Sequence, residues 1–128
     1  MTELVKSFTF GEAIEEKVAV KFSEEGVVVK ATSPSDNICG VTLFGGEKDS
    51  VGDVLMMGFG IVATSSAVNV GDFLTVDEGG KLETFDENVL TGVVNVVGQV
   101  LETASAAAKL NAIINPHVVV ISDVSENS

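Results

Sequence analysis

The sequence predicts an all-β fold, a compact β-barrel or sandwich built from two related hairpin units with an extended N-terminal arm. Valine is the most frequent apolar residue, Phe is the only aromatic type, and 13 glycines are spread along 128 residues. Branched side chains fit a pleated strand better than a helix. Short apolar runs separated by Gly, Asp and Ser are typical of strands joined by tight turns.

A second observation is that part of the sequence occurs twice. Each copy has an alternating stretch, an acidic turn with glycine, and an apolar strand broken by one glycine. The matched segments are residues 13–22 and 67–76, 23–26 and 77–80, and 38–43 and 96–101. The two copies are 54 residues apart over residues 13–26 and 58 residues apart at the paired Gly40 and Gly98. The second copy therefore contains an insertion between these two matched parts. The two copies share no reactive group, which favours a structural or binding module.

The length fits one domain with a single core. We expect residues 1–12 to form an N-terminal arm, residues 13–121 a single β-domain with copies at 13–45 and 67–104, and residues 122–128 an acidic tail. The strands are expected at residues 2–10, 17–22, 27–31, 38–43, 51–57, 59–63, 72–76, 81–85, 93–101, 110–114 and 117–121. In the second of these, alternation places Val18, Val20 and Phe22 together on the buried face of a half-buried strand. Pro116 is expected to end one of them, and residues 104–108 are too short to form a helix alone.

The charge excludes one class of partner. The net charge is −12, with 19 acidic residues against seven lysines and no arginine. Nucleic-acid binding depends on neutralising phosphates with Lys and Arg, so a nucleic-acid partner is not expected. No apolar run has the length of a membrane span, and the N-terminus lacks a signal-peptide core. We therefore expect a soluble protein that is made without export and has no membrane partner.

Two patterns resemble binding motifs without their structural context. Residues 58–63 match a loose G-x-G-x-x-A dinucleotide pattern, with Asp77 near the place of a ribose-binding acid. That site needs a helix after the glycines, and none is predicted. The acids of residues 47–53 and 72–78 lack the spacing of a calcium loop. We interpret the glycines as a bend between strands and the acids as turn residues.

Cys39 and His117 are the only cysteine and the only histidine. Cys39 lies in an apolar strand and is predicted to be a small core residue. One Cys and one His cannot supply a four-ligand metal site within a monomer. A nucleophile–base pair between them would need support that the local sequence does not provide. We therefore predict no enzyme, no catalytic residue, no cofactor and no metal.

The N-terminal segment offers a candidate contact surface. Leu4, Lys6, Phe8 and Phe10 alternate along residues 2–10, outside the matched units. The segment is either an ordinary first strand or an arm that adds to the sheet edge of a neighbour, through main-chain hydrogen bonds. In the second case its deletion would leave a folded domain. The four residues are the predicted partner-binding residues.

The order of the β elements resembles the small capsid decoration (cement) proteins of tailed bacteriophages. In that family a G-D-x-L…D…G-K hairpin precedes a V-x-G-x-[AV]-L-E-x-A strand. The matching residues here are Gly71-Asp72-Phe73-Leu74, Asp77, Gly80-Lys81 and Val97-Gly98-Gln99-Val100-Leu101-Glu102-Thr103-Ala104. The likeness covers residues 13–114. The sequence departs from the pattern at residues 105–108 and in the added tail.

The resemblance implies a virion structural protein, made in the host cytoplasm, that sits on the outer surface of a phage head. It implies a homotrimer at three-fold positions that binds the major capsid protein and stabilises the lattice. One alternative is a sugar- or host-receptor-binding surface module, which the lack of Trp and Tyr disfavours. Another is an enzyme whose site forms between subunits around Cys39, His117 or the acids.

Overall fold

The computed structural model describes residues 3–85 and 92–121. Within them there is no helix and nine strands carry the fold, which confirms the predicted all-β class. The strands are β1 (Leu4–Phe10), β2 (Ala19–Glu24), β3 (Val27–Lys30), β4 (Ile38–Thr42), β5 (Val51–Ala63), β6 (Phe73–Val76), β7 (Leu82–Thr84), β8 (Gly92–Val100) and β9 (Lys109–Ile121). The predicted acidic tail, residues 122–128, lies outside the described residues.

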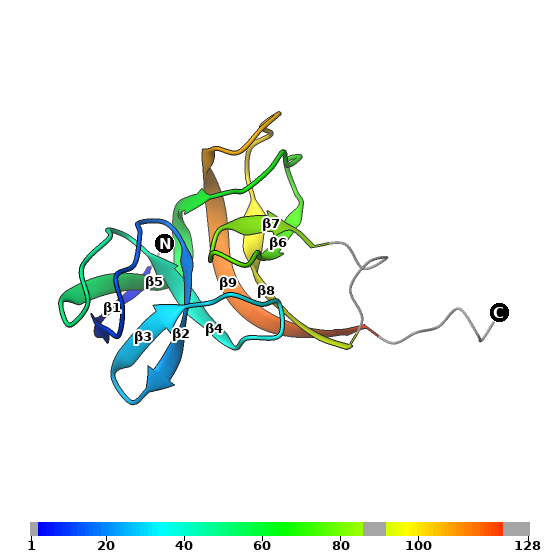
Figure 1. Cartoon of the computed structure of the whole chain (residues 1–128). Helices are drawn as coiled ribbons and strands as arrows, with labels where there is room; N and C mark the ends of the chain where they lie inside the picture. The colour runs from blue at the N-terminus through cyan, green and yellow to red at the C-terminus, as the bar shows by residue number, and fades with distance from the viewer. Residues whose placement is uncertain (1–2, 86–91, 122–128) are drawn as a thin grey trace.

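Five strands close a barrel in the order β1-β3-β2-β4-β5, with β5 pairing back to β1. β1 runs parallel to β3, where Phe10 lies opposite Val28, and antiparallel to β5, where Val5 lies opposite Leu55. β2 and β3 form the hairpin that the turn at residues 23–26 predicts. Figure 1 shows β1 to β4, in blue and cyan, on one side of the molecule and β6 to β9 on the other.

The N-terminal segment is part of this barrel. Its strand pairs with β5 over six register positions and ends beside β3. Phe10, the last residue of β1, is fully buried. Of the two alternatives for this segment, the ordinary first strand describes the structure. Deleting residues 2–10 would therefore open the barrel, contrary to the expectation that a folded domain remains.

β5 also begins a second ring of strands. The first part of β5 pairs with β1 and β4, whereas its second part pairs with β9. The order then continues through β8, β6 and β7, and a single parallel bridge from Leu82 to Thr64 returns to the end of β5. We call residues 4–57 the first half and residues 58–115 the second half.

The two halves pair their strands in the same register. Val20 lies opposite Gly40 in the first half, and Leu74 lies opposite Gly98 in the second. Further matched pairs are Val5–Leu55 with Phe59–Ile113, Phe10–Val28 with Thr64–Leu82, and Ile14–Gly46 with Val68–Ala104. The correspondence therefore includes β1 and β5, beyond the segments that the sequence likeness covers.

Two predicted strand breaks do not occur. β5 is continuous through Gly58, so the expected separate strands at residues 51–57 and 59–63 are one strand of 13 residues. β9 is also continuous through Pro116. The register against β8 shifts between Val96 and Gly98, beside this proline. Because a bulge leaves a position without a ladder hydrogen bond, the missing N–H of proline is tolerated there.

The expected strand at residues 17–22 begins later, at Ala19. Lys17 has a φ of 64° and lies in the turn before the strand; its counterpart in the second half, Gly71, has a φ of 91°. The predicted alternation also fails, because Ala19 and Val20 are both buried. The strand is covered on both faces, since one face lines the first barrel and the other packs under the second half.

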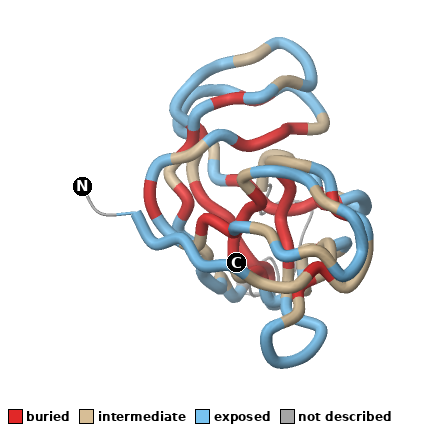
Figure 2. The backbone as a smooth tube through the Cα atoms, turned by 90° about the vertical axis from the view of Figure 1, so that its left-hand side faces the viewer, coloured by how far each residue is buried: buried red, intermediate tan, exposed pale blue. Residues whose placement is uncertain are grey.

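The buried side chains form two clusters. The smaller one fills the first barrel and consists of Phe10, Ile14, Val18, Val20, Val28 and Val54. The larger one joins the interior of the second half to the outer face of the first, where Ala19, Val41 and Leu55 contribute. Figure 2 shows the buried residues along the strands and exposed residues along most connections.

The burial of Phe10 generates a first prediction. Replacing Phe10 with Ala should lower the free energy of unfolding by about 3–5 kcal/mol, because it leaves a cavity in the smaller core. Phe44 is the control, since its side chain is 68% exposed and Phe44→Ala should change stability by less than about 0.5 kcal/mol. Denaturant unfolding followed by circular dichroism measures both; equal midpoints would contradict a structural role for β1.

The paired glycines Gly40 and Gly98, one in each half, generate a second prediction. A Cβ at Gly98 would overlap the backbone carbonyl of Ile113, and one at Gly40 would overlap that of Leu55. Gly98→Ala should therefore destabilise the protein by about 1–3 kcal/mol through overpacking. A Cβ at Gly79 would lie 3.7 Å from its nearest contact, on Asp77, so Gly79→Ala is the matched control. A Gly98→Ala protein as stable as this control would show that the strands can separate.

Candidate partner-binding surfaces

The motif-like residues have structural roles. The glycines of residues 58–63 lie within β5, which no helix follows, so the dinucleotide pattern has no helix N-terminus. The Asp77 carboxylate accepts hydrogen bonds from the backbone N–H groups of Gly79, at 2.8 Å, and Lys81, at 3.0 Å. It therefore stabilises the β6–β7 turn, as a turn residue is expected to do.

Two further acids, Asp53 and Asp72, also accept local hydrogen bonds. Asp53 accepts a 2.6 Å hydrogen bond from the Ser7 hydroxyl, and Asp72 accepts hydrogen bonds from the backbone N–H of Asn69 and the Thr84 hydroxyl. No group of three or more potential metal-ligating side chains is found in the described part of the chain.

Cys39 and His117 do not form an activated pair. The Cys39 side chain is half-buried against the smaller core, and burial raises the pKa of its thiol to about 11. A reactive thiol needs the opposite shift. His117 is exposed on β9, with Nδ1 2.7 Å from the carbonyl oxygen of Asn115.

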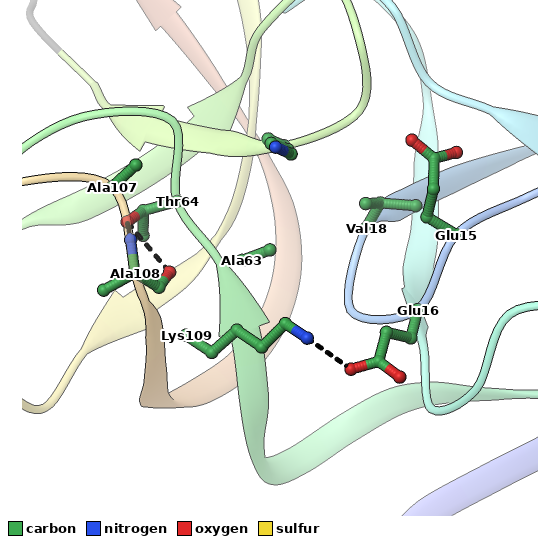
Figure 3. Close-up of a pocket in the computed structure, with 9 residues that line it drawn as sticks. Glu15, Glu16, Val18, Ala63, Thr64, Ala107, Ala108 and Lys109 are labelled. Carbon is green, nitrogen blue, oxygen red and sulfur yellow. Dashed lines mark hydrogen bonds and ion pairs between the residues drawn. The ribbon is translucent and has the colours of Figure 1, made fainter.

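A hollow of about 400 Å³ lies where the two halves meet. Figure 3 shows Lys109 of β9 pointing across it toward Glu16, with Nζ 2.6 Å from the carboxylate. The hydrogen bond and charge of Lys109 lower the pKa of Glu16. The Thr64 hydroxyl is bonded to the backbone of Ala108. Each polar group named here already has a partner, so the hollow is a junction between the halves with an ion pair across it.

The predicted partner-binding residues lie at one end of the first barrel. Along β1 the even positions pass from the core to the surface: Phe10 is fully buried, Phe8 half-buried, Lys6 exposed and Leu4 48% exposed. Phe22 of β2 packs edge-to-face on Phe8, with ring centroids 5.1 Å apart. We call Leu4, Lys6, Phe8 and Phe22 the barrel end. Phe10 is not available to a partner in this structure.

Sequence reasoning missed Phe22 as a surface residue, because alternation assigned it to the buried face. It is 47% exposed. Comparing the two copies shows the difference in exposure. Phe22 of the first copy corresponds to Val76 of the second, and Val76 is fully buried. The same position is therefore open in one half and covered in the other.

Comparison with solved structures gives a structural likeness. No family model matches the sequence, and no curated protein matches it. The fold is similar to the crystal structure of the head fiber gp8.5 N base in bacteriophage phi29, with a TM-score of 0.66, 16% identity, and coverage of 89% of this chain and 95% of that one. At this identity the likeness shows a shared fold. No helix that could span a membrane occurs within the described ranges.

The burial of Cys39 generates a third prediction. With a pKa of about 11, about one thiol in a thousand is ionised at pH 8. Alkylation of Cys39 by iodoacetamide should therefore be on the order of a hundred-fold slower in the folded protein than in the same chain unfolded in urea. Mass spectrometry of quenched samples measures both rates. Comparable rates would contradict the half-buried, protonated thiol.

Proposed function

We propose that this chain is a non-enzymatic structural protein of a phage head, bound to the outer surface of the capsid through the major capsid protein. The observation that carries the proposal is the shared fold with a head fiber base over nearly the whole of both chains. Sequence resemblance to capsid decoration proteins, over residues 13–114, supports the same location. The finer role, stabilising the lattice, rests on that resemblance alone.

The surface chemistry supports this location. A net charge of −12 without arginine suits a component that faces away from the packaged genome. The named polar groups serve turns and ion pairs, which agrees with a non-enzymatic role. Many identical copies on a symmetric lattice also let a weak single contact hold by avidity. A homotrimer would multiply that effect.

The barrel end supplies the proposed partner contacts. Leu4 and Lys6 are exposed, and Phe8 is half-buried beside Phe22. These residues combine apolar area with one positive charge in a strongly acidic protein. Their partner is either the capsid protein or a sister subunit.

A co-sedimentation experiment tests the function. The purified chain should pellet with mature heads of the phage that encodes it, saturate at a fixed number of copies per head, and remain soluble without heads. The variant Leu4→Ser/Lys6→Glu should bind about tenfold more weakly. The control Val70→Ser/Lys48→Glu makes the same chemical changes at exposed positions away from the barrel end and should bind normally.

The stabilising role has a separate readout. Heads saturated with the chain should release DNA at a higher temperature than bare heads. If the chain binds heads but does not raise the temperature of DNA release, its role is attachment to the head and not stabilisation of the lattice. Failure to bind heads at all would contradict the proposed function.

A further inference from the structure

The two halves expose equivalent faces to different extents. In the first half a row of residues paired across β1, β5, β4 and β2 points away from the barrel interior. This first row consists of Val5, Leu55, Val41 and Ala19, and its counterpart, the second row, consists of Phe59, Ile113, Gln99 and Phe73. Because directly opposite residues share one side of a sheet, each row is a continuous strip.

The first row is largely buried, whereas the second row has an exposed phenylalanine at each end. Leu55, Val41 and Ala19 are at most 2% exposed, and only Val5, at the end of the row, is 39% exposed. By contrast, Phe59 is 43% exposed and Phe73 is 48% exposed. Between these two ends of the row lie Ile113 and Gln99, which are half-buried. Exposed large apolar side chains on one sheet face mark an interaction surface.

The first row is buried because the second half covers it. The backbone at Gly60 comes so close to Leu55 that a Cβ there would overlap its side chain, and the N–H of Ala19 donates a 2.8 Å hydrogen bond to the carbonyl of Gly80. Gly60 and Val76 are the second-half counterparts of Lys6 and Phe22. The first row is thus packed against the equivalent of the barrel end.

Each of the two surfaces in this contact therefore has a counterpart elsewhere in the chain that is not covered. The second row is the counterpart of the covered row, and the barrel end is the counterpart of the surface that covers it. We propose that a second copy of this chain places its barrel end on the second row, so that copies associate head to tail. This inference specifies the sister-subunit contact suggested under the proposed function, and it does not require capsid binding.

The contact between copies must differ in detail from the one within the chain. Phe73 replaces the small Ala19, and Lys6 replaces Gly60, so the backbones cannot approach to the same hydrogen-bond distance. The contact is then made by side chains, with Phe22 and Leu4 of one copy facing Phe59 and Phe73 of the next. Aromatic side chains in such a position often carry much of the binding energy of an interface.

Charge adds a second expectation. Copies with a net charge of −12 repel one another, and salt screens that repulsion while leaving apolar contacts intact. Self-association should therefore strengthen as salt rises. A head-to-tail contact uses two different surfaces on each copy, so it closes into a ring or continues as a chain of copies.

Mixing two variants of the full chain tests the proposal by sedimentation velocity, without heads. Phe59→Ser/Phe73→Ser removes the second row, and Leu4→Ser/Phe22→Ser removes the barrel end. Each variant alone should associate at least about 30-fold more weakly than the native chain. Because each retains one intact surface, their mixture should form one-to-one dimers and nothing larger.

Val118→Ser/Val120→Ser is the matched control, since both valines are exposed on β9 outside these surfaces. It should associate as the native chain does. Circular dichroism checks the fold of each variant, and Gln replaces Ser in any variant that fails to fold.

Three results would overturn the proposal. The first is a native chain that stays monomeric at high concentration and high salt. The second is normal association of the barrel-end variant, which would indicate that the second row pairs with itself. The third is a mixture without dimers. Because heads are absent, each of these is distinguishable from failure of capsid binding.

Discussion

The close packing of Leu55 against the backbone at Gly60 is the contact on which the arrangement of the whole molecule depends. Both residues belong to β5, the strand that serves the first barrel with its first part and the second half with its second part. Only a residue without a Cβ lets the strand bring its own second part so near to Leu55. This contact places the outer face of the first half under the second, and the larger core forms there. The hydrogen bond from Ala19 to Gly80 fixes the same junction from β2.

That junction makes two similar halves expose different faces to solvent. The first row is covered while the barrel end stays in contact with solvent. In the second half the second row is exposed at its two ends, and the surface equivalent to the barrel end is covered. A chain of two equivalent units thereby exposes a different surface on each unit. Asp77 stabilises a turn, Cys39 packs against the smaller core, and His117 lies on the surface.

Much of the fold was predictable from local patterns, and the errors have physical causes. Valine-rich runs and Gly–Asp turns located most strands because these residues act through their own backbone preferences. Pro116 was expected to end a strand, but a register shift between β9 and β8 at this position accommodates it. Lys17 was placed in a strand although its backbone is left-handed, and only its correspondence with Gly71 could have shown this. Phe22 was assigned to the core because alternation reports which side a residue faces and not whether anything covers that side.

The sequence by itself determined the all-β class, the hairpins, the repeated unit, the charge and the lack of a reactive motif, because each is a property of composition or of neighbours along the chain. The tertiary structure decided that residues 4–10 are a barrel strand, that Phe10 is core, and which of two equivalent rows is exposed. These outcomes depend on how β5 passes from one half to the other. Residues with the same local pattern, such as Leu55 and Ile113, then meet different neighbours, and burial follows from those neighbours.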